Sequence, residues 1–193
     1  TDSLINFVCY LTDKCGLSEK TASNTLCTVK SILRYGEKMN VMHSCVMSAV
    51  SVKSKPKEMR VLTCDEYKKL TAHFICEKSA FSVGMLTALL TGLRIGELCA
   101  LQWKDIDEDC VTVRKTMQRL QKISGFGSEV VLGSPKTKTS ARVIPLPSFL
   151  NSYIERFKQG RDEMDYVLST DERPVVEPRV MQYKFKKYMC DLN

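Results

Sequence analysis

The sequence predicts a two-domain, mainly α-helical protein with one small antiparallel β-sheet. Three features lead to this prediction. Apolar residues recur at helical spacing along most of the chain, strict alternation replaces that spacing shortly after Trp103, and a basic segment without periodicity separates an N-terminal part from the rest. The 193 residues are more than one small domain needs. A hydrophobic content of 44% is typical of a globular protein with a buried core.

Two helices are expected in the N-terminal part, over residues 3–15 and 18–39. Ser18 follows Gly16 and is placed to cap the second helix, whose apolar stripe consists of Ala22, Leu26, Val29 and Leu33. The opposite face carries side chains spaced four and three residues apart: Lys20, Asn24, Cys27, Ser31, Arg34 and Lys38. This face is either an ordinary solvated surface or a surface laid against DNA, where Lys and Arg meet phosphates and Asn and Ser reach bases.

A basic linker is expected over residues 53–60. The surrounding stretch "SVKSKPKEMR" holds four basic residues, one acid and a proline, and it has no periodicity. A second domain then extends over residues 61–193. It opens with the capping box Thr63-Cys64-Asp65-Glu66, which starts a helix that runs to about Glu77.

The second domain continues with helices and a short run of strands. A helix over 79–90 ends at Gly92, and a shorter one covers 94–101. Alternation in "CVTVRKTM" predicts a strand, and two further strands before Gly133 and over 141–146 complete the sheet. The remaining expected elements are a helix from Pro147 to Gly160, a short strand over 166–169 and a final helix over 178–188.

Composition narrows the classes of function. The net charge of +7 suits a polyanionic partner. No apolar run approaches the roughly 20 residues that a membrane span needs, so we expect a cytoplasmic protein without a membrane partner.

The metal-binding residue types are scattered. The nine cysteines form no Cys-x-x-Cys pair, and neither His43 nor His73 lies near a cysteine cluster with ligand spacing. We therefore expect reduced core cysteines and neither a metal nor a cofactor. An acidic cluster follows Trp103, and we interpret it as a turn between helix and strand rather than as a nuclease metal site: Asp105, Asp107, Glu108 and Asp109.

The segment "TGLRIGEL", residues 91–98, places an arginine just after a helix-ending glycine. Arg94 is expected in the first turn of the next helix, where free backbone N–H groups favour anions. Glu97 lies three residues further on and can hold one edge of the guanidinium, which leaves donors for two phosphate oxygens. The alternative is an ordinary Arg–Glu surface pair at the start of a helix.

The segment "SPKTKTSARVIPL" is basic. Lys136, Lys138 and Arg142 lie in it, and no acid occurs between Val130 and Pro147. The segment is either a solvated basic loop or a hairpin whose lysine donates a proton to a leaving alkoxide, or meets phosphate charge, in a groove.

Together, "TGLRIGELCALQWKDID", a β-hairpin and "PKTKTSARVIPL" resemble the tyrosine recombinase (phage integrase) family, in particular the integrases of phages and conjugative transposons of Gram-positive bacteria. The resemblance covers nearly the whole chain. It implies that residues 1–52 are the C-terminal part of a helical, SAM-like core-binding domain and that residues 61–193 are a truncated α+β catalytic domain. The family cleaves one DNA strand by attack of a tyrosine hydroxyl, which gives a 3′-phosphotyrosine and a free 5′-hydroxyl without metal or nucleotide.

The resemblance assigns roles to individual residues. Arg94 matches the first catalytic arginine, Glu97 the acid that supports it, and Lys136 the hairpin lysine, for which Lys138 is the poorer match. Double-stranded DNA at recombination sites is the expected partner, with self-assembly on DNA by the intact protein. The expected DNA-binding residues are Lys20, Asn24, Arg34, Lys53, Lys55, Lys57, Lys138 and Arg142.

Part of the family's pattern is missing. Neither His43 nor His73 begins a His-x-x-Arg motif, and "YKFKKYMCDLN" resembles the stretch just before it. Tyr183 and Tyr188 are therefore expected to be core or DNA-facing residues, and no nucleophile is expected in the chain. Two hypotheses remain: a fragment of an integrase that binds DNA without cutting it, or a naturally shortened, non-catalytic DNA-binding regulator of recombination.

Overall fold

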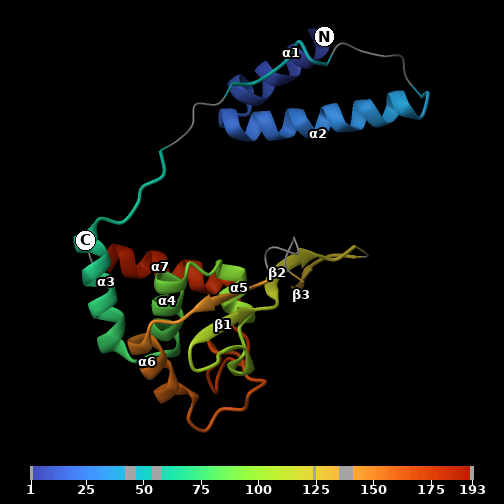
Figure 1. Ribbon diagram of the computed structural model, residues 1–193. Helices are drawn as coiled ribbons and strands as arrows, with labels where there is room; N and C mark the ends of the chain where they lie inside the picture. Colours follow the sequence, from blue (N-terminus) through green and yellow to red (C-terminus); the bar gives the residue numbers. More distant parts are fainter. Residues whose placement is uncertain (1, 42–46, 54–57, 124, 135–140, 192–193) are drawn as a thin grey trace. The chain divides into compact units, whose positions relative to one another are not determined.

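The computed structural model describes residues 2–41, 47–53, 58–123, 125–134 and 141–191 (Figure 1). The chain divides into two compact units, Thr1–Val61 and Leu62–Asn193. Each unit has its own buried residues. Within the described residues, no helix combines the length and apolar character needed to cross a membrane.

The first unit is built on two helices. Helix α1, Asp2–Cys9, continues into a π-helical turn, and α2 covers Glu19–Lys38. The Ser18 hydroxyl accepts a hydrogen bond from the Thr21 backbone N–H at 3.2 Å, so the predicted cap is confirmed. The predicted stripe is confirmed in part: Ala22 and Leu26 are buried, the other two of its residues are half-buried, and the polar face on the other side of the helix is exposed.

Helices α3 and α4 form the centre of the second unit. Helix α3, Cys64–Glu77, begins with the predicted capping box, in which Thr63 and Glu66 exchange side-chain-to-backbone hydrogen bonds. Helix α4, Ala80–Thr91, has a continuous run of buried residues from Phe81 to Thr87. Gly92 ends it with φ +68°, a left-handed conformation that glycine adopts without steric cost.

The strands form two antiparallel ribbons. Strand β1, Cys110–Val113, pairs with β4, Arg142–Pro145, while β2, Thr116–Gln121, pairs with β3, Ser128–Gly133. For the sheet the sequence predicted three strands, the first of which joined β1 to the first two residues of β2, and it missed the rest of β2. Beyond Met117 the residues of β2 are exposed on both faces, so no alternation of apolar and polar residues marks them. The β2–β3 ribbon extends away from the helices of this unit (Figure 1).

The strand predicted over 166–169 is wrong. Tyr166 makes only an isolated bridge to Gln102, and the Val167 N–H donates to the Leu101 carbonyl at 2.9 Å. The apolar residues of this segment are buried because it packs on the core, and a short buried turn has the same composition as a short buried strand.

Three further helices complete the second unit: α5, Ile95–Ala100, α6, Ser148–Lys158, and α7, Pro178–Asp191, with a 3₁₀ turn over Trp103–Asp105. Gly96 allows α5 to lie directly on β2. A Cβ atom at this position would lie 2.7 Å from the Thr116 hydroxyl and 2.8 Å from the Met117 carbonyl oxygen. This close approach places the start of α5 beside the strands.

Candidate functional site

Glu97 is the centre of a cluster at the start of α5. Arg94 is the N-cap of this helix, with an extended backbone, so it precedes the first turn in which the sequence placed it. Its backbone N–H donates to Glu97 Oε2 at 3.0 Å, and its Nη1 donates to Glu97 Oε1 at 2.9 Å. The predicted Arg94–Glu97 pair is therefore present.

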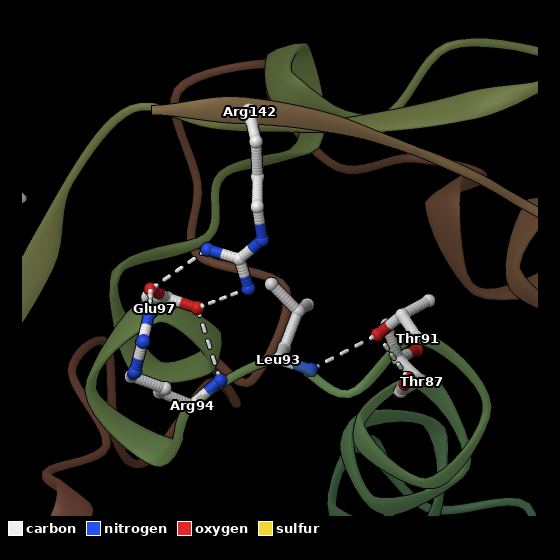
Figure 2. Close-up of polar contacts among 6 residues, drawn as sticks. All are labelled: Thr87, Thr91, Leu93, Arg94, Glu97 and Arg142. Atoms are coloured by element: carbon white, nitrogen blue, oxygen red, sulfur yellow. Dashed lines mark hydrogen bonds and ion pairs between the residues drawn. The ribbon is translucent and has the colours of Figure 1, made fainter. Parts of the chain in front are cut away.

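Arg142 binds the same carboxylate from β4 (Figure 2). Its Nη1 donates to Glu97 Oε1 at 3.0 Å and its Nη2 donates to Oε2 at 2.9 Å, which is the parallel, two-bond geometry that guanidinium and carboxylate groups favour. Each oxygen of Glu97 thus accepts two hydrogen bonds. The sequence did not predict this contact, because 45 residues separate the two partners.

The three side chains of the cluster differ in exposure, and their charges shift the pKa values of one another. The Glu97 side chain is 4% exposed, Arg142 is 29% exposed and Arg94 is 70% exposed. Burial by itself raises the pKa of Glu97, but the hydrogen bonds from Arg142 and Arg94 outweigh it and lower the pKa to about 2. The hydrogen bond to Glu97 likewise raises the pKa of Arg142. Two cations therefore share one anion, and the cluster keeps a net positive charge.

The turn between α4 and α5 directs Arg94 outward. The Thr91 hydroxyl donates to the Thr87 carbonyl and accepts from the Leu93 N–H at 3.4 Å (Figure 2). Leu93 is buried in the core, while the Arg94 side chain next to it is largely exposed. One edge of the Arg94 guanidinium is held by Glu97, and among the described residues no further partner is found for this side chain.

The other predicted site residues lie either in the first unit or outside the described residues. Lys20, Asn24 and Arg34 are exposed on α2, and Lys53 is exposed after it, all in the first unit. The remaining predicted residues lie outside the described ranges: Lys55, Lys57, Lys136 and Lys138.

Asp105, the first residue of the acidic stretch after Trp103, has a structural role. Asp105 is 4% exposed, accepts a hydrogen bond from the Gln102 N–H at 3.2 Å and lies 3.2 Å from Arg114 Nε. Within the described ranges no three His, Cys, Asp or Glu side chains gather in a metal-binding arrangement.

The two C-terminal tyrosines differ in environment. Tyr188 packs in an aromatic group with His73, Phe74 and Phe81, and its ring stacks on Phe81 at 5.1 Å between centroids. Burial, with a hydrogen bond to Glu77, raises the pKa of Tyr188 to about 12. Tyr183 is 74% exposed.

Comparison with known proteins identifies the class to which this fold belongs: the integrase-type recombinases. The model of the phage integrase family matches residues 60–192. The chain is 30% identical to the ICEBs1 integrase of Bacillus subtilis over 157 residues, 77% of this chain and 40% of that protein. It is 28% identical to the tyrosine recombinase XerA of Thermococcus onnurineus over 140 residues, 70% of this chain and 42% of that protein.

The chain belongs to the phage integrase family of tyrosine recombinases. The resemblance drawn from its two motifs is thereby confirmed. The chain spans about two fifths of the length of these curated relatives.

Solved structures confirm the fold class. The Tn1549 transposon integrase in complex with a circular intermediate DNA superposes with a TM-score of 0.71 at 19% identity, covering 96% of this chain and 64% of the other. A lambda integrase tetramer bound to a Holliday junction gives 0.63 at 17% identity, covering 96% and 51%. The chain is thus mainly helical, with its antiparallel strands in two short ribbons.

Proposed function

We propose that this chain is part of a DNA integrase that cleaves and rejoins strands through a 3′-phosphotyrosyl intermediate, and that residues 1–193 bind duplex DNA without cutting it. The observation that carries the proposal is the Arg94 side chain. It is largely exposed, held on one edge by the buried Glu97, and part of a cluster with net positive charge.

The chemistry explains why an arginine is needed at this position. Attack on a phosphodiester raises negative charge on the non-bridging oxygens, and a fixed guanidinium can bind two of them at once. Glu97 fixes the orientation of Arg94 before DNA arrives, so little reorganisation is needed during the reaction. In the intact protein Lys136 would protonate the departing 5′ oxygen.

Duplex DNA is the partner that the charge distribution supports. The exposed face of α2 carries Lys20, Asn24 and Arg34, which suit contacts with phosphates and base edges. Self-assembly on DNA belongs to the same proposal, and the lambda integrase tetramer bound to a Holliday junction supports it. We also propose a cytoplasmic location.

A salt titration tests DNA binding by the chain. Binding to a short duplex of arbitrary sequence should weaken steeply with salt, by about 0.9 in the log–log slope for each phosphate contact. Arg94→Gln should lower the slope by about 0.9, the value for one phosphate contact. Arg156→Gln removes an equal charge from an exposed position on α6 and should have a smaller effect.

Two outcomes would count against the proposal. Affinity that does not change between low and high salt would reject the phosphate contacts. Strand cleavage by residues 1–193 alone would show that the chain holds a nucleophile after all.

A further inference from the structure

Arg142 stands out because both of its terminal nitrogens point inward to a buried carboxylate. Its Nη1 and Nη2 occupy both oxygens of Glu97 at 3.0 and 2.9 Å. Its side chain is 29% exposed, whereas that of Arg94 is 70% exposed. In this geometry the exposed Arg94 side chain is open to an incoming phosphate, whereas both terminal nitrogens of Arg142 donate to Glu97.

The charge balance shows what Arg142 contributes. Arg94 and Glu97 alone would form a neutral pair, and Glu97 would compete with a phosphate for the Arg94 guanidinium. Arg142 adds the second positive charge and engages both carboxylate oxygens. The pair it makes is shielded from water, where charge interactions are stronger than at an exposed site.

We propose that Arg142 is a positioning residue for Arg94. It neutralises the charge of Glu97, so the positive charge of the Arg94 guanidinium is not cancelled and remains available to a DNA phosphate. This inference rests on the proposed function, because it assumes that Arg94 meets DNA. It assigns Arg142 an indirect role in place of the direct DNA contact that its basic segment suggests.

A double-mutant cycle on the 193-residue chain separates the two roles. The affinity for a short duplex is measured by salt titration for wild type, Arg142→Gln, Glu97→Gln and the double variant. If Arg142 acts through Glu97, Arg142→Gln should weaken binding severalfold and lower the salt slope by about 0.9 while Glu97 is present. In the Glu97→Gln background the same substitution should have little effect, because there is no carboxylate left to neutralise.

The opposite pattern would overturn the inference. A direct phosphate contact by Arg142 predicts equal weakening in both backgrounds, or greater weakening in the Glu97→Gln background, where Arg142 is released. Removing the acid Glu97 changes DNA affinity by itself. This change cancels in the cycle, because the effect of Arg142→Gln is measured there between two proteins that both carry Glu97→Gln. Arg142→Lys keeps the charge and should retain most of the wild-type affinity; affinity as low as that of Arg142→Gln would also contradict the inference.

A measurement on the unchanged protein covers the case in which Arg142→Gln does not fold. Side-chain NMR signals of the guanidinium groups are followed while duplex DNA is added, with assignment by Arg94→Lys and Arg142→Lys. The Arg94 signals should shift, and those of Arg142 should stay close to their starting positions. Arg142 signals that shift as much as those of Arg94 would refute the positioning role.

These results also distinguish the inference from the proposed function. If wild type shows no salt-dependent binding, or if Arg94→Gln binds like wild type, then the proposed function fails at this site and the inference with it. If Arg94→Gln weakens binding and the cycle is additive, only the role of Arg142 is wrong.

Discussion

Protonation of Glu97 should destabilise the second unit in acid, and Glu97→Gln should remove that dependence. The carboxylate is buried and accepts four hydrogen bonds, two from Arg142 and two from Arg94. Its pKa is lowered from 4.5 to about 2 in the folded state, because these bonds outweigh the cost of burial. A group with a lowered folded pKa contributes stability above its unfolded pKa and loses it as pH falls through the folded pKa.

The magnitude follows from the size of the shift. One pKa unit corresponds to about 1.4 kcal/mol, so Glu97 should contribute about 3 kcal/mol at neutral pH, which is lost between about pH 4.5 and pH 2. Other carboxylates also titrate in this window. The test therefore uses the difference in the free energy of unfolding between wild type and Glu97→Gln. That difference should be nearly constant above pH 5 and should shrink by roughly 3 kcal/mol toward pH 2.

The assay uses the single tryptophan of the chain. Trp103 is buried in the second unit, so its fluorescence reports the unfolding of that unit in urea at each pH. Glu129→Gln serves as the control, because Glu129 is exposed on β3 and is not one of the three residues of the cluster. A wild-type curve that runs parallel to the Glu97→Gln curve from pH 5 to pH 2 would refute the reasoning.

Three further predictions concern DNA. Substituting both Lys20 and Arg34 with alanine should weaken binding of the chain to duplex DNA without a change in the free energy of unfolding; lower stability with intact binding would show that this face of α2 packs against protein. In the intact enzyme, Arg94→Lys should bind DNA nearly normally but cleave it more slowly, because lysine lacks the two-donor fork. The activation free energy of cleavage, measured in single-turnover reactions, should rise by about 3 kcal/mol or more. A cleavage rate close to wild type would contradict the two-donor contact of Arg94 with the phosphate. Lys136→Ala should be rescued by a bridging-sulfur substrate whose leaving group needs no proton, and rescue of Lys138→Ala in its place would reverse the assignment.

The sequence by itself determined the interactions between residues that are close together along the chain. The Thr63–Glu66 capping box, the Ser18 cap and the Arg94–Glu97 pair all join residues three apart, a separation that a helix start brings together in any protein. The apolar stripe of α2 was equally predictable, because one helix face must be buried. The family was recognisable for a related reason, since its two motifs are short, contiguous segments.

The tertiary structure decided what joins distant segments. Strand β2 carries no alternation because its residues beyond Met117 are exposed on both faces. Val167 and Leu168 are apolar because they pack on the core rather than because they form a strand. The partnership of Arg142 with Glu97 spans 45 residues and joins α5 to β4, two elements that only the packing of this unit brings together. A basic residue in a basic segment has the same sequence signature whether it faces DNA or a buried carboxylate, since only packing determines which anion lies within its reach.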